Sequence, residues 1–416
     1  MSSSYLKILR SNNFFLLFFS QIISQFGDKL TQMALIGLVY KLEGSSSLTL
    51  AKILSLTILP VFFISPIAGV YIDRWDKRKT MYISDFLRGF LMLLIPIVFF
   101  KFKSLFIIYI LVFFSFSLGR FFIPAKMSII PLLVSSQELG GANSLISSAA
   151  TIAAILGFGL GGLIVQGLGV GVAFTIDALT FFISAFAILF IKVKSEGSFK
   201  AKDIFDLSKE AIIKVKNSFI FEIREGLNYL LKTKETRYAS RIFFILFSCV
   251  GSLYTVFIVF IQETFMSITL DLGIFAVGAV LGLLLGSLIY GKFGLKFSLD
   301  RTINFSLFFS SLYLIFFVSL LKFYPIKVFA LTSCFILGIL ESPVVIAVNT
   351  LVHKESNNQF WGRTFSSLEV IIHLAFIVFM FLSSYLAEKF NSFTIIIFVG
   401  IIISIFSSFE LIKERL

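Results

Sequence analysis

Four polar side chains recur on one face of a long apolar run near the N-terminus. Their spacing of i, i+4, i+7 and i+11 places them on one side of an α-helix; they are Gln21, Gln25, Asp28 and Gln32. Such groups are costly in an apolar medium and usually face a cavity or one another. We therefore expect this stripe to line an internal pathway, with Asp28 as a site that binds and releases a proton. The alternative is a structural pair, in which Lys29 or another buried cation neutralises Asp28.

The second half of the chain has a milder polar pattern and one further acid in an apolar run. Ser252 and Thr255 lie close to one face of their run, and we expect them to line the same cavity as Asp28. Glu341 precedes Pro343, and a proline can break a helix and free backbone carbonyls at depth. We expect Glu341 to exchange protons as a second acid; the alternative is a pair with an unidentified partner.

Two other polar sets have open roles. Glu369 and His373 are spaced i, i+4, so they can form either a structural pair or a proton relay, and we favour the structural pair. Asp177 lies inside an apolar run, and its type and position assign it no role.

Long apolar segments must position these side chains. Only 14% of the residues are charged and 58% are hydrophobic, whereas roughly 25% are charged in a soluble domain. Runs of about 18 or more apolar residues can cross the hydrocarbon core as helices. The first run is too long for a cleaved signal sequence. The sequence predicts an all-α polytopic membrane protein with about twelve transmembrane helices, over residues 14–40, 48–72, 82–100, 104–123, 142–168, 171–191, 240–262, 270–291, 302–321, 325–349, 364–387 and 392–411.

The distribution of charge predicts topology and domain organisation. Only seven of the 36 Lys and Arg fall in loops on the side away from the N-terminus, which by the positive-inside rule places both termini in the cytoplasm, with the chain in the cell membrane. We expect six-helix bundles over residues 1–191 and 240–416, joined by a basic connector, 192–239, with an amphipathic helix on the cytoplasmic face. The net charge of +13 indicates topology and contact with membrane lipid, and no nucleic-acid motif accompanies it.

Corresponding loops in the two halves have similar sequences. The loop after the second helix is "GVYIDRWDKRK", and the loop after the eighth is "SLIYGKFGLKF". Their register matches, but Gly291 stands where the first loop has Asp73. Repeated halves of this kind are typical of secondary transporters, in which two bundles rock around a central site.

The first of these loops resembles the cytoplasmic loop 2–3 signature of the major facilitator superfamily. The matching residues are Gly69, Asp73, Arg74, Arg78 and Lys79, whereas Asp76 stands where that family usually has glycine. The stretches "SQFGDKLTQMAL", "PAKMSIIPLLVSSQELGGANSL", "FTIDALTFFISA" and "WGRTFSSLE" are similar to the macrolide-efflux branch of the superfamily. The resemblance covers nearly the whole chain and implies two six-helix bundles that transport a small molecule.

The resemblance also implies a cytoplasmic gate, in which this loop holds the two halves together when the transporter faces outward. We expect Asp73 to lie at the N-terminus of the eleventh helix, where free N–H groups favour an anion; an ordinary positive-inside loop is the alternative. Asp85 and Arg88 are spaced i, i+3 and predict a salt bridge that shapes the gate. Arg120 could pair with phosphate, Glu138 or Asp73.

A glycine-rich segment in the fifth helix, "GFGLGG", resembles the antiporter motif of the same family. Gly157, Gly161 and Gly162 match that motif, and Phe158 replaces its proline. Glycines at this spacing let helices approach closely. The segment also fits a dinucleotide-binding pattern, but no strand–helix unit surrounds it, so we exclude that use.

These features exclude several classes of protein. The chain has two histidines, no H-E-x-x-H and no Walker sequence, so we expect neither an enzyme nor a metal or other cofactor. A channel or scramblase would not need the Asp73 loop. The sequence predicts a monomeric secondary active transporter that exports an amphipathic or hydrophobic small molecule, such as a macrolide-like drug or a siderophore, in exchange for protons bound at Asp28 and Glu341. An importer or lysophospholipid flippase of the same fold is the alternative.

Overall fold

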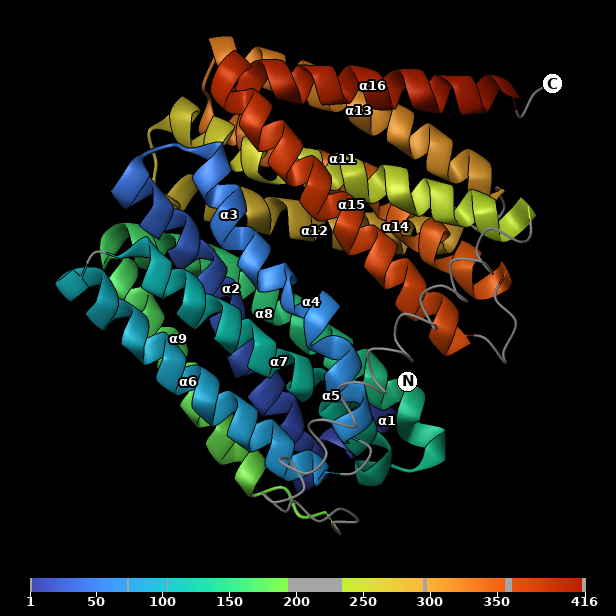
Figure 1. Ribbon diagram of the computed structural model, residues 1–416. Helices are drawn as coiled ribbons and strands as arrows, with labels where there is room; N and C mark the ends of the chain where they lie inside the picture. The colour runs from blue at the N-terminus through green and yellow to red at the C-terminus, as the bar shows by residue number, and fades with distance from the viewer. Residues whose placement is uncertain are drawn as a thin grey trace. The chain divides into compact units, whose positions relative to one another are not determined.

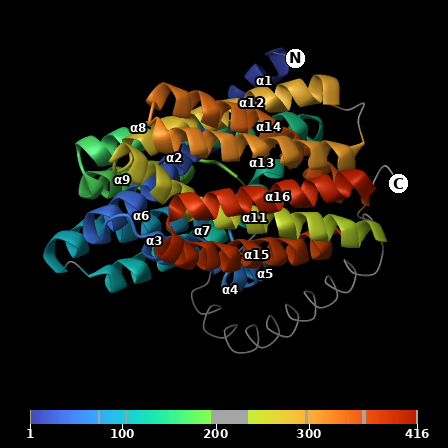
Figure 2. The ribbon, with the colours of Figure 1, turned by 90° about the horizontal axis from the view of Figure 1, so that it is seen from above.

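The computed structural model describes residues 2–72, 75–102, 104–193, 234–294, 298–355 and 361–413. Over these ranges the chain forms helices and no strand (Figures 1 and 2). Ten of the helices are long and apolar enough to cross a membrane. The prediction of an all-α polytopic membrane protein is confirmed. The chain divides into two compact units, Met1–Leu38 with Ile53–Phe219, and Val39–Lys52 with Ile220–Leu416.

The helices of the N-terminal half follow the predicted spans closely. In chain order they are α1 (Ser2–Leu9), α2 (Asn12–Glu43), α3 (Ser47–Ile58), α4 (Pro60–Phe63), α5 (Ser65–Ile72), α6 (Lys77–Phe102), α7 (Leu105–Leu133), α8 (Leu139–Gly167) and α9 (Val170–Leu189). Helix α6 packs against both α7 and α9 (Figure 1). This packing brings polar residues of distant segments together.

Two predicted spans differ from the observed helices. The second, residues 48–72, is three successive helices, α3 to α5, because Pro60 begins a new helical segment and has no N–H to continue the preceding one. The chain keeps a helical course there, since the Ile64 N–H donates to the Pro60 carbonyl oxygen at 2.8 Å. The predicted end of the fourth span at residue 123 is wrong, because α7 continues through Pro124 and Pro131 to Leu133.

Over the described residues from 234 onward, the C-terminal half forms six long helices. They are α11 (Lys234–Phe265), α12 (Leu270–Phe293), α13 (Leu299–Phe323), α14 (Lys327–Glu355), α15 (Trp361–Phe390) and α16 (Ser392–Lys413). Helices α12 and α14 pack most closely at glycines: a Cβ on Gly282 would lie 2.0 Å from the Phe335 carbonyl oxygen, and one on Gly338 would lie 2.3 Å from that of Ala279. Small residues at these positions let the two backbones touch.

Large apolar side chains are exposed along many helices of both units. Phe100, Phe106, Phe186 and Leu288 each have more than 60% of their surface exposed. Soluble monomers rarely expose extended apolar surface, whereas a helix facing lipid needs it. The smaller buried faces are therefore where polar contacts between helices form.

Candidate functional site

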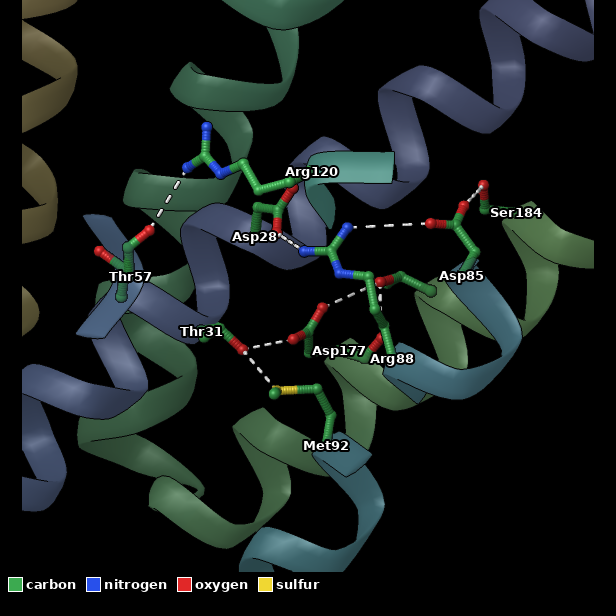
Figure 3. Close-up of polar contacts among 10 residues, drawn as sticks. Asp28, Thr31, Thr57, Asp85, Arg88, Met92, Arg120, Asp177 and Ser184 are labelled. Atoms are coloured by element: carbon green, nitrogen blue, oxygen red, sulfur yellow. Dashed lines mark hydrogen bonds and ion pairs between the residues drawn. The ribbon is translucent and has the colours of Figure 1, made fainter. Parts of the chain in front are cut away.

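Arg88 lies at the centre of a buried polar cluster in the first unit (Figure 3). Its side chain, on α6, is 7% exposed. The guanidinium Nη2 donates to Oδ1 of Asp28 on α2 at 2.5 Å, and Nη1 lies 3.8 Å from Oδ1 of Asp85 one turn away on α6. The guanidinium carbon also sits 4.1 Å from the ring centroid of Phe181. Arg88 is thus held by a close ion pair, a distant carboxylate and an aromatic face.

Asp85 is fully buried and has an incomplete set of hydrogen bonds. Its Oδ2 accepts a hydrogen bond of 2.6 Å from the hydroxyl of Ser184 on α9. Its Oδ1 has no hydrogen-bond partner among the residues that the structure describes. A buried carboxylate oxygen without a hydrogen-bond donor is unfavourable, so the contacts in this structure stabilise the ionised form of Asp85 only in part.

Asp177 of α9 is also fully buried, but both of its carboxylate oxygens are paired. Oδ2 accepts a hydrogen bond from the hydroxyl of Thr31 of α2, and Oδ1 accepts one of 3.2 Å from Thr180. The helices meet here because Gly27 has no side chain: a Cβ on it would lie 2.1 Å from both Asp177 Oδ1 and Thr180 Oγ1. Asp177, which the sequence left without a role, therefore joins α9 to α2.

Two lysines add positive charge near these aspartates. Lys126 of α7 interacts electrostatically with Asp28 and Asp85. The ammonium of Lys29 lies 5.3 Å from the ring centroid of Phe158 on α8. Among the described residues, neither ammonium is within salt-bridge distance of a carboxylate, so the alternative pairing of Asp28 with Lys29 is not formed, and the cation that contacts Asp28 is Arg88.

The three glutamines of the predicted stripe lie along α2 beside Asp28, and two of them are hydrogen-bonded to each other. Gln21 is 1% exposed, and its side-chain oxygen accepts a hydrogen bond of 3.2 Å from Gln25 Nε2. Gln25 and Gln32 are half-buried. The stripe thus follows α2 from a buried amide to the half-exposed Asp28.

The antiporter-like glycines face α2. A Cβ on Gly157 would lie 2.5 Å from Cβ of Lys29, and one on Gly161 would lie 3.3 Å from Cγ of Met33. Gly162 is buried in the same helix, α8. The segment "GFGLGG" is therefore a close packing surface between α8 and α2, as glycine spacing in membrane helices favours.

The loop that resembles the superfamily signature is described in part. Asp73 and Arg74 lie outside the described residues, and Gly69 falls within α5. Arg78 Nη1 donates to the Ile191 carbonyl oxygen at 2.9 Å, which ties the start of α6 to the end of α9. Asp76, the departure from the family pattern, caps α6 by accepting a hydrogen bond of 2.9 Å from the Lys79 N–H.

Arg120 and Glu138 do not pair with each other. Arg120 Nη2 donates to the Thr57 carbonyl oxygen at 3.4 Å. Glu138 instead contacts the Lys7 ammonium at 2.9 Å and forms a capping box with Ser135 at the start of a short 3₁₀ helix, Ser136–Glu138, that precedes α8. The suggested pairing of Arg120 with Glu138 is therefore absent from this structure.

In the second unit the predicted polar residues make contacts between helices. Thr255 is fully buried, with its hydroxyl 2.6 Å from that of Ser384 on α15. Ser252 is also buried. Glu341 lies against Ser310 of α13. Helix α14 runs unbroken through Pro343, so the expected break beside Glu341 is wrong.

Two further predictions concern α15 and the connector. Nδ1 of His373 lies 2.7 Å from the backbone carbonyl oxygen of Glu369, one turn earlier on α15. The predicted amphipathic helix in the connector falls largely on residues 194–233, outside the described ranges. Asp73 also lies outside them, so its place at the N-terminus of the eleventh helix stays a prediction.

Sequence reasoning missed the hydroxyls that complete the cluster. Thr31 lies beside Gln32 and Ser184 lies in an apolar run, and their partners lie 146 and 99 positions away. A weak signal existed for Thr31, which adjoins the glutamine stripe. Over the described residues, no group of three or more His, Cys, Asp and Glu side chains is arranged to hold a metal ion. With carboxyl groups on Asp28, Asp85 and Asp177 and a guanidinium on Arg88, the cluster has the groups to take up a proton or to neutralise a cation.

Comparison with known families identifies this arrangement of helices. The profile of the Major Facilitator Superfamily matches residues 17–359. The chain belongs to the major facilitator superfamily. Among its relatives in the superfamily, the macrolide efflux protein A of Streptococcus pyogenes is 25% identical over 387 residues, covering 90% of this chain and 89% of that protein. The MFS-type transporter YkuC of Bacillus subtilis (strain 168) is 26% identical, over 86% of this chain and 81% of its own length.

One further relative matches about half of the chain, and a solved structure has a similar fold. A protein of Bacillus subtilis (strain 168) named as a bacilysin exporter, BacE, is 30% identical over 52% of this chain and 54% of its own length. A crystal structure of a POT family transporter superposes with a TM-score of 0.74 at 15% identity, covering 97% of this chain and 96% of that one. The chain is therefore a multi-pass membrane transporter of this superfamily.

Proposed function

We propose that this transporter exports an amphipathic or hydrophobic small molecule, such as a macrolide-like drug or a siderophore, in exchange for protons. It works by alternating access in the cell membrane, as a monomer with both termini in the cytoplasm. The relatives named for macrolide efflux and bacilysin export support the direction and the class of cargo. The apolar helices, with few fixed charges, suit a cargo that partitions into lipid.

The single observation that supports proton coupling is the Arg88 cluster. It places two fully buried aspartates, Asp85 and Asp177, beside Asp28 and the guanidinium. Buried charges are costly unless paired, so taking up or releasing one proton changes the stability of this cluster substantially. Exchange requires that the cargo and the proton favour different states of the transporter, and a cluster with several carboxylates around a single guanidinium can supply that difference.

Gate and cavity roles follow the same proposal. Gly69, Asp73, Arg74, Arg78 and Lys79 form the cytoplasmic gate. Gln32 and the residues beside it on α2 line the central pathway. Helices α2, α6 and α9 then form the part of the N-terminal bundle that responds to protons, and Glu341 supplies a second acid in the C-terminal bundle.

The proposal is tested by measuring accumulation of radiolabelled erythromycin in bacterial cells that lack their own macrolide exporters. Cells producing the parent protein should accumulate less label than cells producing Asp28→Asn, and a protonophore should abolish the difference. Asp271→Asn, which alters another buried, ion-paired aspartate, is the matched control and should export as well as the parent. Equal accumulation in all strains, with movement of labelled lysophosphatidylcholine instead, would favour the flippase alternative.

A further inference from the structure

The three aspartates around Arg88 differ in what holds them. The side chain of Asp28 is 28% exposed and in close contact with the guanidinium. Both oxygens of Asp177 accept hydrogen bonds from hydroxyls. Asp85 is fully buried, and of its two oxygens only Oδ2 has a hydrogen-bond donor among the described residues. The environment therefore suits charge on Asp28 better than on Asp85.

The guanidinium of Arg88 is shared unequally. Nη2 is bonded to Asp28 at 2.5 Å, but Nη1 stops 3.8 Å from Asp85, beyond hydrogen-bond distance. Its Nε has no hydrogen-bond partner in the described part of the chain. In this structure Arg88 therefore holds Asp28 closely and Asp85 only at a distance, and a small movement of its side chain would bring the guanidinium onto Asp85.

We propose that Asp85, rather than Asp28, holds the exchangeable proton, and that Arg88 alternates between these two aspartates. While Arg88 is bonded to Asp28, Asp85 is a neutral carboxylic acid. When Asp28 leaves the guanidinium, Arg88 moves onto Asp85, the O–H bond of Asp85 breaks, and the proton leaves for solvent. The role of this step in transport rests on the proposed function.

Because Asp85 loses its proton when Arg88 leaves Asp28, a cationic cargo that pairs with Asp28 can start this step. An amine-bearing cargo that binds the half-exposed Asp28 takes over the charge pairing that Arg88 supplied. The guanidinium then pairs with the Asp85 carboxylate, and one proton is released for each cation bound. Cargo and proton therefore compete for the cluster, which is the condition for exchange.

Charged groups on four helices face Asp85 or the arginine beside it. Arg88 of α6, Asp28 of α2 and Lys126 of α7 interact electrostatically with Asp85, whereas Asp177 of α9 interacts with Arg88. Lys126 and Asp177 do not contact the Asp85 carboxyl at hydrogen-bond distance, so they set the background field. The close contacts are those of Ser184 and, after the switch, of Arg88.

Infrared spectroscopy of the purified full-length protein in liposomes tests this assignment without any cargo. The carboxylic acid C=O stretch is recorded as the pH is raised from mildly acidic to mildly alkaline. The parent should show an acid band at neutral pH that Asp85→Asn lacks at every pH. In Asp28→Asn the band should persist only at lower pH, because Arg88 is then free to pair with Asp85. Asp271→Asn is the matched control and should leave the band unchanged.

A second variant protects the test against a misfolded Asp85→Asn protein. Ser184→Ala removes the hydrogen bond to Oδ2 and should move the acid band to higher frequency, because its carbonyl oxygen loses a donor. Gel-filtration retention confirms that each variant is folded. An acid band that is unmoved in Ser184→Ala, or that is lost at every pH in Asp28→Asn and kept in Asp85→Asn, overturns the proposal.

The result is separable from the test of the proposed function. A band assigned to Asp85 in a protein that shows no protonophore-sensitive export would leave the protonation site standing and refute proton-driven efflux. Protonophore-sensitive export by a protein without such a band would support proton-driven efflux and refute Asp85 as the protonation site.

Discussion

Replacing Arg88 by glutamine removes the guanidinium that Asp28 contacts and leaves a neutral side chain of similar reach. Breaking a buried ion pair from one side costs about 3–5 kcal/mol. Because the Asp28 side chain is 28% exposed and can draw some solvent, we expect a loss near the lower end, about 3 kcal/mol, in the free energy of unfolding. The lost contact with the face of Phe181 is part of this cost.

The double variant Arg88→Gln with Asp28→Asn decides whether that cost is electrostatic. It leaves two neutral side chains that can hydrogen-bond, so it should be more stable than Arg88→Gln alone. With Asp28→Asn as the second single variant, the double-mutant cycle should give an interaction energy of about 0.5–3 kcal/mol. Unfolding is followed by tryptophan fluorescence as SDS is added to the purified protein in detergent. Lys7→Gln is the control, since it breaks the ion pair of the solvent-accessible Glu138 with a lysine that is 77% exposed and should cost far less than Arg88→Gln. Additive effects of the two substitutions, or equal costs for Arg88→Gln and Lys7→Gln, would refute this account of the cluster.

Two further predictions concern packing and capping, and both use the same unfolding assay. Gly282→Ala should destabilise the protein by about 1–3 kcal/mol, because the new Cβ would lie 2.0 Å from the Phe335 carbonyl oxygen. In the control Gly291→Ala, on the same helix, the new Cβ meets nothing within 4 Å, so stability should change by less than about 1 kcal/mol. Equal effects would contradict the close packing of α12 and α14. Asp76→Ala removes the cap on the Lys79 N–H and should cost about 0.5–2 kcal/mol, with Asp76→Asn largely preserving stability; an equal loss in Asp76→Asn would show that the side chain has another role.

The fold was predictable because a membrane imposes long apolar runs. Each predicted span corresponds to an observed helix or, for residues 48–72, to the series α3 to α5. The errors fall at prolines, whose effect depends on tertiary packing. Pro60 begins a new segment, whereas Pro124 and Pro343 lie inside continuous helices. A proline removes one backbone hydrogen bond, but this does not end a helix in a membrane, because no water is present there to replace the remaining backbone hydrogen bonds.

Only part of the membership of the candidate site was predictable from the sequence. Helical spacing identified the stripe containing Asp28, and the i, i+3 spacing of Asp85 and Arg88 placed them on one face. Spacing cannot show that the guanidinium reaches across to Asp28, 60 positions away, in preference to its neighbour on α6. Nor can it show that Gly27 brings Asp177 within hydrogen-bond distance of Thr31. Contacts between distant segments depend on how the helices pack.

The most direct test of proton-coupled export is the movement of protons themselves. Purified protein is reconstituted into liposomes containing a pH-sensitive fluorescent dye, with a potassium ionophore to clamp the membrane potential. An outward gradient of erythromycin, the drug being loaded inside, is then imposed with no initial pH gradient. The account predicts that erythromycin leaving the liposomes drives protons inward in the parent and the Asp271→Asn control, and that Asp85→Asn abolishes this flux. Erythromycin efflux from parent liposomes with no acidification of the lumen would contradict proton exchange.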